Sequence, residues 1–130
     1  MAKLRWNCEA RGCFNVKRRP KIEVFDDCFP GSIEFGDVDA IVEMGGRAIL
    51  LEWKSEAAYI PRGQQIMYER LSAKGIFAMV VHGNAETMEV KAYCFFWAGR
   101  QSHWRPASLD DVRSRIRAWA AWASLSKVSA

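Results

Sequence analysis

The stretch G-D-V-D-A-I-V-E-M-G-G-R-A-I-L-L-E-W-K, residues 36–54, decides the fold of this chain. Apolar and acidic residues alternate along residues 37–43 with the period of two that a half-buried strand requires. The pair Gly45-Gly46 then predicts a tight turn, after which Leu50 and Leu51 belong to a second strand of interior type. The stretch therefore predicts a β-hairpin.

The turn also predicts the register of this hairpin. Both strands advance one residue per step away from the turn, so Asp39 is expected to face Glu52. By the same count, Asp37 is expected to face Lys54. Two carboxylates directly opposite each other on a sheet repel, and a divalent cation between them removes that repulsion. Magnesium is commonly held by one or two carboxylates, with water and phosphate at its other positions.

Lys54 adds a cation beside the two acids. It follows Glu52 by two residues, so both side chains are expected on one face of the strand. An ammonium group there can steady a phosphate or an attacking water during phosphodiester hydrolysis. The alternative is that these are solvated charges on an exposed sheet face, where an ion pair of Lys54 with Asp37 contributes little.

The spacing of these charges resembles a known nuclease motif. Asp39 and the triplet Glu52-Trp53-Lys54, reached through a short hairpin, resemble the PD-(D/E)xK nuclease superfamily. Val38 stands where the superfamily has a proline that binds no ligand. The likeness spans about residues 36–81, a third of the chain.

A glutamine narrows the resemblance. The virus-type replication-repair nucleases and their Holliday-junction resolvase relatives place a glutamine at the start of the helix after E-x-K. Gln64 stands there, in the segment P-R-G-Q-Q-I-M-Y-E-R-L-S-A-K-G at residues 61–75. From the residues alone, capping of the helix by Gln64 or Gln65 is an equal alternative.

This resemblance implies a fold and an activity. The implied fold is α/β with a restriction-endonuclease-like core, a mixed central β-sheet flanked by helices in the order αβββαβ, with an extra strand and a C-terminal helix. The implied activity is that of a DNA endonuclease dependent on Mg²⁺ or Mn²⁺. The implied metal ligands are Asp39, Glu52, the backbone carbonyl of Trp53, and Glu9; the implied catalytic residues are Lys54 and Gln64.

Two further acids leave the metal set open. Glu9 matches a first-helix glutamate of the related nucleases, but an ion pair with Arg5 or Arg11 on a helix surface explains it equally well. Glu34 precedes Asp39 on the same approach, although its odd spacing points it away in a regular strand. Glu34 therefore ranks below Glu9.

Charge is distributed unevenly along the chain. Residues 1–21 contain seven Lys and Arg and one acid, residues 22–99 contain twelve acids and six bases, and residues 100–130 contain six bases and two acids. Basic ends around an acidic centre suit a polyanion such as DNA, although charged termini also serve solubility alone. The candidate nucleic-acid contacts are Lys17, Arg18, Arg19, Lys21, Arg62 and Arg105.

Composition predicts one domain over residues 1–130, with half its residues apolar and six tryptophans to form a core. No apolar run approaches a membrane span and no signal peptide opens the chain, so we expect a protein of the cytoplasm, in bacteria or in a phage-infected host. Four cysteines are expected to be free thiols. A zinc site built from Cys8, Cys13 and Cys28 with His82 or His103 is the alternative, but no C-x-x-C pair supports it.

The remaining elements follow from periodicity and turn residues. A helix is expected over residues 3–14, a strand over 21–25, a helix over 64–74, strands over 76–81 and 88–97, and a polar loop over 100–106. Met67 and Leu71 are expected on the buried side of the second helix. A capping box at Ser108 and Asp111 predicts a last helix.

Two alternatives concern partners. The apolar stripe of the last helix is expected to dock on the sheet, and a homodimer contact through Trp119 and Trp122 is the sharper alternative. The loop at His103, Trp104 and Arg105 interleaves aromatic and cationic groups in a way that suits nucleic acid, or Trp104 fills the edge of the core. The runner-up function is a binding module that keeps a nuclease fold without turnover.

Overall fold

The computed structural model describes residues 20–55 and 58–125, and the chain divides into two compact units, Met1–Asp37 and Val38–Ala130. In the first unit, residues Ile22–Cys28 form a short 3-10 helix, η1, and a turn follows at Pro30. The strand predicted over residues 21–25 is therefore wrong. A strand needs a neighbouring strand, whereas here the N–H of Val24 bonds the nearby carbonyl of Lys21 at 3.1 Å, so the backbone satisfies its hydrogen bonds locally.

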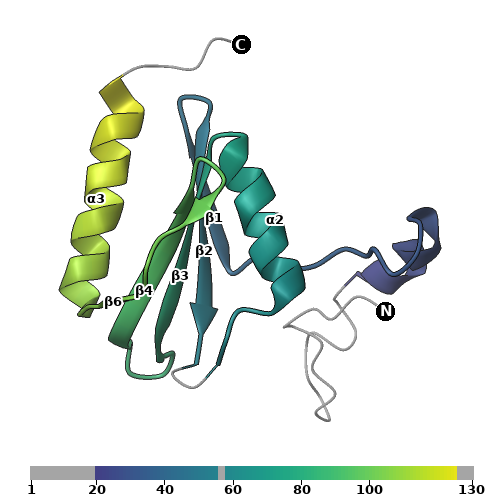
Figure 1. The fold of residues 1–130 in the computed structure, drawn as a ribbon, viewed down its shortest axis with the longest axis horizontal. Coiled ribbons are helices and arrows are strands. Elements are labelled where there is room, and N and C mark those ends of the chain that lie inside the picture. The colour runs from purple at the N-terminus through teal and green to yellow at the C-terminus, as the bar shows by residue number, and fades with distance from the viewer. Residues whose placement is uncertain (1–19, 56–57, 126–130) are drawn as a thin grey trace. The chain divides into compact units, whose positions relative to one another are not determined.

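The described part of the second unit is a mixed α/β structure (Figure 1). Its elements are β1 (Ala40–Met44), β2 (Arg47–Lys54), α2 (Arg62–Ala73), β3 (Ile76–Asn84), β4 (Glu89–Trp97), β5 (Arg100–Gln101), β6 (Arg105–Pro106) and α3 (Leu109–Leu125). The sheet order is β1-β2-β3-β4-β5, and β6 also pairs with β4. Strands β2 and β3 run parallel on either side of the α2 crossover, and the other pairs are antiparallel. The predicted α/β class with a mixed sheet is confirmed.

The register of the central hairpin is as predicted. Ala40 pairs with Leu51 and Met44 with Arg47, across a turn whose Gly45 and Gly46 both have positive φ, 61° and 88°. Such a turn matches the twist of the two strands, and glycine adopts it without strain.

The prediction that one face of the first strand is buried is wrong. Strand β1 is exposed along residues 40–43, with 58% of Ile41 and 50% of Val42 accessible. The reason is position, because β1 is the edge strand, whereas α2 packs over β3, β4 and β5. Sequence alternation shows that a strand has two unlike faces, but it does not show whether a helix covers one of them.

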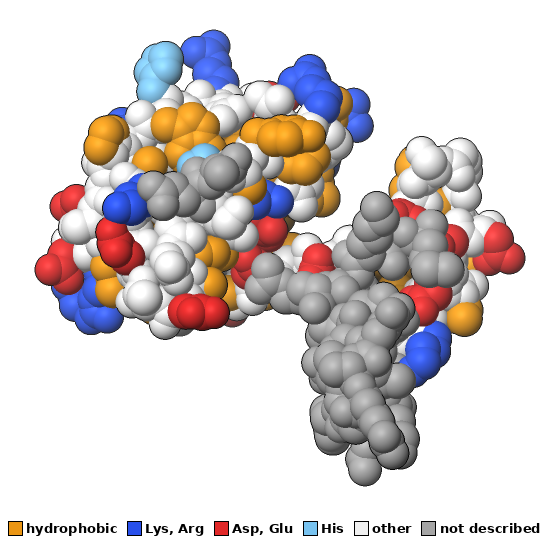
Figure 2. Space-filling model, turned by 90° about the horizontal axis from the view of Figure 1, so that it is seen from below, with side chains coloured by type: hydrophobic (Ala, Val, Ile, Leu, Met, Phe, Trp, Pro, Cys, Tyr) orange, Lys and Arg blue, Asp and Glu red, His pale blue; other side chains and the backbone are white. Residues whose placement is uncertain are grey.

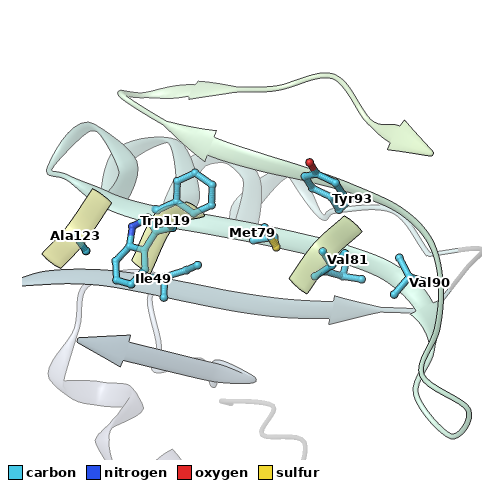
Figure 3. Packing of buried hydrophobic residues seen from close by; sticks show 9 residues of the cluster. Ile49, Met79, Val81, Val90, Tyr93, Trp119 and Ala123 are labelled. Atoms are coloured by element: carbon cyan, nitrogen blue, oxygen red, sulfur yellow. The ribbon is translucent and has the colours of Figure 1, made fainter. Parts of the chain in front are cut away.

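Helices α2 and α3 cover opposite faces of the sheet (Figure 1). On the α2 face, Tyr68 packs with a buried cluster of strand residues, which are Leu50, Ala78, Val80, Cys94 and Phe96. On the α3 face, Trp119 and Ala123 pack on Ile49, Met79 and their neighbours (Figure 3). Strand β3 is therefore covered on both sides, as its apolar run predicts.

Helix α2 ends at the predicted glycine, since Gly75 follows it with φ of 98°. Its buried side differs from the prediction. Met67 is 38% exposed, while Tyr68 and Ser72 are each 1% exposed, so the inward face is rotated by one residue. The rotation brings a serine, rather than an apolar residue, against the strands.

Ser72 ties α2 to the β4–β5 turn. Its Oγ donates to the carbonyl of Glu69 at 2.9 Å and accepts the N–H of Gly99 at 3.0 Å. We expect Ser72→Ala to lower the free energy of unfolding by about 1–3 kcal/mol, because it leaves the Gly99 N–H without its acceptor. Urea unfolding measures this.

Ser124→Ala is the matched control for that measurement. Ser124 makes the same kind of bond to the carbonyl three residues back, at 3.0 Å, but it is exposed near the end of α3. A change within about 0.5 kcal/mol is expected there. Equal losses for the two variants would contradict the role of Ser72.

Helix α3 begins with the predicted capping box. The N–H of Ser108 donates to Asp111 Oδ2 at 2.8 Å, and the N–H of Asp111 donates to Ser108 Oγ at 3.2 Å. Trp119 is only 4% exposed, so its side chain packs in the core, and a homodimer contact through this helix stays a prediction. Trp122 remains 39% exposed.

No helix within residues 20–55 and 58–125 combines the length and the apolar character needed to cross a bilayer.

Candidate active site

The charged residues singled out by the sequence gather where β2 and β3 end. In the parallel register, Glu52 pairs with Val80 and Lys54 with His82. Val80 belongs to the cluster on the α2 face, and side chains of paired residues point to the same side of a sheet. Glu52, Lys54 and His82 therefore share the face that α2 covers, at the end of the sheet from which α2 starts (Figure 1).

Glu52 and Lys54 form a sheltered ion pair. Lys54 Nζ lies 3.6 Å from Glu52 Oε1, and their side chains are only 16% and 8% exposed. The chain contains the same E-x-K spacing at Glu89 and Lys91, where the pair is 2.6 Å apart and the side chains are 62% and 47% exposed. The solvated-surface interpretation fits Glu89 and Lys91 and not the pair on β2, because burial weakens the screening of charge by water.

Asp39 is fixed against the same strand. It directly precedes β1, and its Oδ2 accepts a hydrogen bond of 2.5 Å from the backbone N–H of Trp53. The indole Nε1 of Trp53 in turn donates to the carbonyl of Gly83 at 3.1 Å. The strand pairing ends at Ala40 and Leu51, and Asp39 and Glu52 are the next residues outward on their two strands. The predicted meeting of two acids thus agrees with the hairpin geometry, and the backbone between Glu52 and Lys54 holds one of them.

Only part of the implied metal set lies in this unit. Asp39, Glu52 and the carbonyl of Trp53 offer the hard oxygen donors that Mg²⁺ prefers. Across the described residues, no group of three or more His, Cys, Asp or Glu side chains is arranged to hold a metal ion. Two carboxylates suffice for magnesium when water and phosphate complete its shell, so the donor chemistry fits.

The remaining candidate acids lie outside the described part of this unit. Glu9 lies outside the described residues. Glu34 and Asp37 belong to the other compact unit, so their roles, including the pairing of Asp37 with Lys54, stay predictions.

Gln64 carries a buried acceptor that its surroundings leave unsatisfied. It lies in the first turn of α2, and its Oε1 is buried without a hydrogen-bond donor from the described residues. Gln65, by contrast, accepts from Arg62 at 3.0 Å and donates to Gln101 at 2.8 Å. An unsatisfied buried amide oxygen costs about 1–3 kcal/mol, so a bound water or ligand is the expected partner. This favours the site role of Gln64 over capping through Oε1.

The sequence suggests that His82, at a strand end, could approach a substrate and that Trp104 could contact nucleic acid, but it does not predict that the two lie together. Their rings stack with centroids 4.0 Å apart and planes 20° apart, and His82 is the direct neighbour of Lys54. Burial lowers the pKa of His82 below its ordinary value of 6.5, and the charge of Lys54 lowers it further, against the raising effect of a hydrogen bond that His82 makes to the backbone of Ala58. The available signal was position, since His82 follows the apolar run that pairs with β2.

A neutral His82 makes the fold sensitive to acid. Because the folded-state pKa is below 6.5, the unfolded chain binds more protons as the pH falls below that value, and stability falls with it. We expect His82→Gln to lose less stability than the wild type between pH 7 and pH 5, measured by urea unfolding at both values. An equal or larger loss in the variant would contradict this cause.

Two of the predicted basic contacts, Arg62 and Arg105, belong to the described part of the second unit. Arg62 is exposed at the start of α2, on the side of the site. Arg105 lies 5.5 Å above the ring of Phe95, which packs with the α3-face cluster, so it belongs to the opposite face. Lys21 is exposed in the other unit, and Lys17, Arg18 and Arg19 lie outside the described residues.

The cysteines show no metal site in the described part of the chain. Cys94 is buried on the α2 face, and burial raises its pKa to about 11, which keeps it a protonated thiol. Cys28 is exposed in the first unit. Cys8 and Cys13 lie outside the described residues, so the zinc alternative stays a prediction.

No match was found when the chain was compared with protein-family models, with curated proteins and with solved structures. The case for a function therefore depends on the geometry of the site itself.

Proposed function

We propose that this chain is a metal-dependent DNA endonuclease of the PD-(D/E)xK type. One observation carries the proposal. Glu52 is 6% exposed, yet it lies on a strand with Asp39 bonded to the next backbone amide and an ammonium group 3.6 Å away. Charges are costly to bury, and a solvated surface role does not require burial, so a functional role explains them better.

Each residue has a distinct task under this proposal. Asp39, Glu52 and the carbonyl of Trp53 would hold Mg²⁺ or Mn²⁺. A bound divalent ion supplies a water of lowered pKa and neutralises charge on the phosphate. Lys54 stabilises the negative charge that develops on the phosphate, since its ammonium group is sheltered from water and fixed beside Glu52. Gln64 orients a water or a phosphate oxygen through its buried amide.

The arrangement of elements supports the same proposal. The hairpin, α2 and the parallel strand β3 follow in the order of the last ββαβ part of the expected core, and β4 and α3 supply the extra strand and C-terminal helix, whereas the first expected strand is replaced by η1. Arg62 at the start of α2 is available for contact with a DNA backbone on the side of the site.

Cleavage of supercoiled plasmid and branched DNA with magnesium tests the proposal. The wild type is expected to cut, and Asp39→Ala and Lys54→Ala proteins that remain folded are expected to lose cleavage. Lys91→Ala, which removes the lysine of the exposed E-x-K pair, is the matched control and should cut like the wild type. Equal activity in all four proteins would exclude this site.

Calorimetric titration with magnesium separates this proposal from a binding module without turnover. A module that only grips DNA has no need to order a cation at Asp39 and Glu52. Heat of binding in the wild type that disappears in Asp39→Ala supports the enzyme, and its absence in both favours the binding module.

A further inference from the structure

We propose that the exposed face of Trp104 is a stacking platform for an unpaired nucleobase next to the phosphate held at Lys54. The cleavage half of this inference rests on the proposed nuclease function, and the binding half does not. The substrate class it names is DNA with at least one unstacked base at the cut, such as an overhang, a flap or a single strand.

Strand pairing places Trp104 at the site. Lys54 pairs with His82, His82 with Ala92, and Ala92 with Pro106, so four strands contribute one row across the sheet. Paired residues share a face, so this row belongs to the face that carries Glu52. Trp104 precedes Pro106 by two residues, and its ring stacks on His82 of the same row.

The small residue in this row lets the indole lie over the histidine. Ala92 separates the strand of His82 from the strand of Pro106, and its methyl group leaves room above it. The indole of Trp104 stacks on the imidazole at 4.0 Å between centroids, with planes 20° apart. Since neighbouring strands lie about 4.8 Å apart, this ring pair is one strand away from Lys54.

The exposure of Trp104 points to a ligand with a flat surface. One side of the indole is against His82, and 36% of the residue remains accessible. Figure 2, which views the molecule from below, shows hydrophobic side chains gathered on the part that carries the sheet, with Lys and Arg side chains near them. An aromatic ring next to cationic side chains is the arrangement that stacks bases of single-stranded nucleic acid.

The other half-exposed tryptophans are differently engaged. Trp97 and Trp122 meet edge to face at 5.5 Å, and the guanidinium of Arg47 covers Trp122 at 3.8 Å. They lie by α3, away from Lys54. Trp122, at 39% exposure, therefore serves as a control for loss of an exposed indole elsewhere.

The platform selects for unpaired bases because both faces of a base within duplex DNA are already stacked on its neighbours. Only a base that has left the stack can lie on the indole. Lys54 and the acids then face the phosphate beside that base, so recognition and cleavage would occur at neighbouring positions of one strand.

Binding is measured by fluorescence anisotropy with a chelator present, which prevents metal-dependent cleavage. The probes are a blunt duplex, the same duplex with a single-stranded overhang, and the overhang with one abasic nucleotide beside the junction. For the overhang, Trp104→Ala is expected to bind about 5- to 100-fold more weakly than the wild type, and Trp104→Phe to retain most of the affinity. Trp122→Ala should bind like the wild type.

The abasic probe tests the platform from the side of the DNA: removal of the base should lower the affinity of the wild type and leave the affinity of Trp104→Ala unchanged. Equal binding of the overhang by Trp104→Ala and Trp122→Ala, or an equal loss on the blunt duplex, would overturn the platform. Wild-type protein that binds through Trp104 but never cuts with magnesium overturns the nuclease proposal and leaves the platform standing. Cleavage at the same rate by the wild type and Trp104→Ala overturns the platform and leaves the nuclease proposal standing.

Discussion

Glu52→Gln is expected to reduce magnesium-dependent DNA cleavage by about 100- to 1,000-fold, because it removes charge at the reaction centre. The amide keeps the shape of the side chain, which is only 6% exposed, so packing against the α2 face is retained. What it removes is the negative charge beside Lys54, next to the Trp53 amide that holds Asp39. Initial cleavage rates of plasmid DNA at saturating magnesium measure the change.

Glu89→Gln is a closely matched control for that experiment. It carries the same substitution in the same E-x-K spacing, but on the exposed pair of β4. Its cleavage rate should equal that of the wild type. A second readout is thermal: magnesium should raise the melting temperature of the wild type and of Glu89→Gln, but not of Glu52→Gln, since only a bound ligand stabilises the fold. A Glu52→Gln protein that cuts and melts like the wild type would exclude Glu52 as a ligand.

Gly83→Ala is expected to destabilise the protein by about 1–3 kcal/mol or more. A Cβ atom there would collide with the carbonyl oxygen of Glu89 and would lie 2.9 Å from Cζ2 of Trp53. The carbonyl belongs to backbone at the β3–β4 register shift between His82 and Gly83, so it cannot swing aside as a flexible side chain does. Urea unfolding gives the loss.

The effect of Gly83→Ala should reach the site as well. Trp53 donates its indole N–H to the carbonyl of Gly83, and its backbone N–H holds Asp39. Displacing the indole therefore disturbs the anchor of one acid, and cleavage should fall along with stability.

Gly63→Ala is the control for Gly83→Ala. Gly63 lies in the first turn of α2, and no atom lies within 4 Å of a Cβ built there. Alanine is the better helix former, so stability should be unchanged or higher by up to about 1 kcal/mol. Similar losses of stability at both glycines would mean that the close approach at Gly83 is not the cause of the loss.

The features predicted correctly are those set by local chemistry. The register of the hairpin follows from Gly45 and Gly46 alone, because a two-residue turn leaves no freedom in the pairing. The capping box at Ser108 and the glycine after α2 are likewise local. With the register comes the meeting of Asp39 with the strand of Glu52, which is why the core of the candidate site could be read from the sequence.

The features that escaped prediction depend on tertiary neighbours. The alternation in residues 21–25 resembles a strand, but η1 forms where hydrogen bonds are satisfied locally. Exposure of β1 depends on where α2 packs, and the inward side of α2 is Tyr68 rather than Met67. The stack of His82 and Trp104 needs the pairing of β6 with β4, two residues long and too short to leave a periodic signal.

The edge position of β1 also determines which part of the site is disrupted first by local unfolding. Within the described residues β1 hydrogen-bonds only to β2, and edge strands open by local fluctuation at a lower free energy than a central strand such as β3. Asp39 directly precedes β1, so each such opening withdraws one carboxylate while the core around Met79 stays closed. The site thus combines Asp39, which lies beside an edge strand that opens at low free energy, with Glu52, which lies on an interior strand.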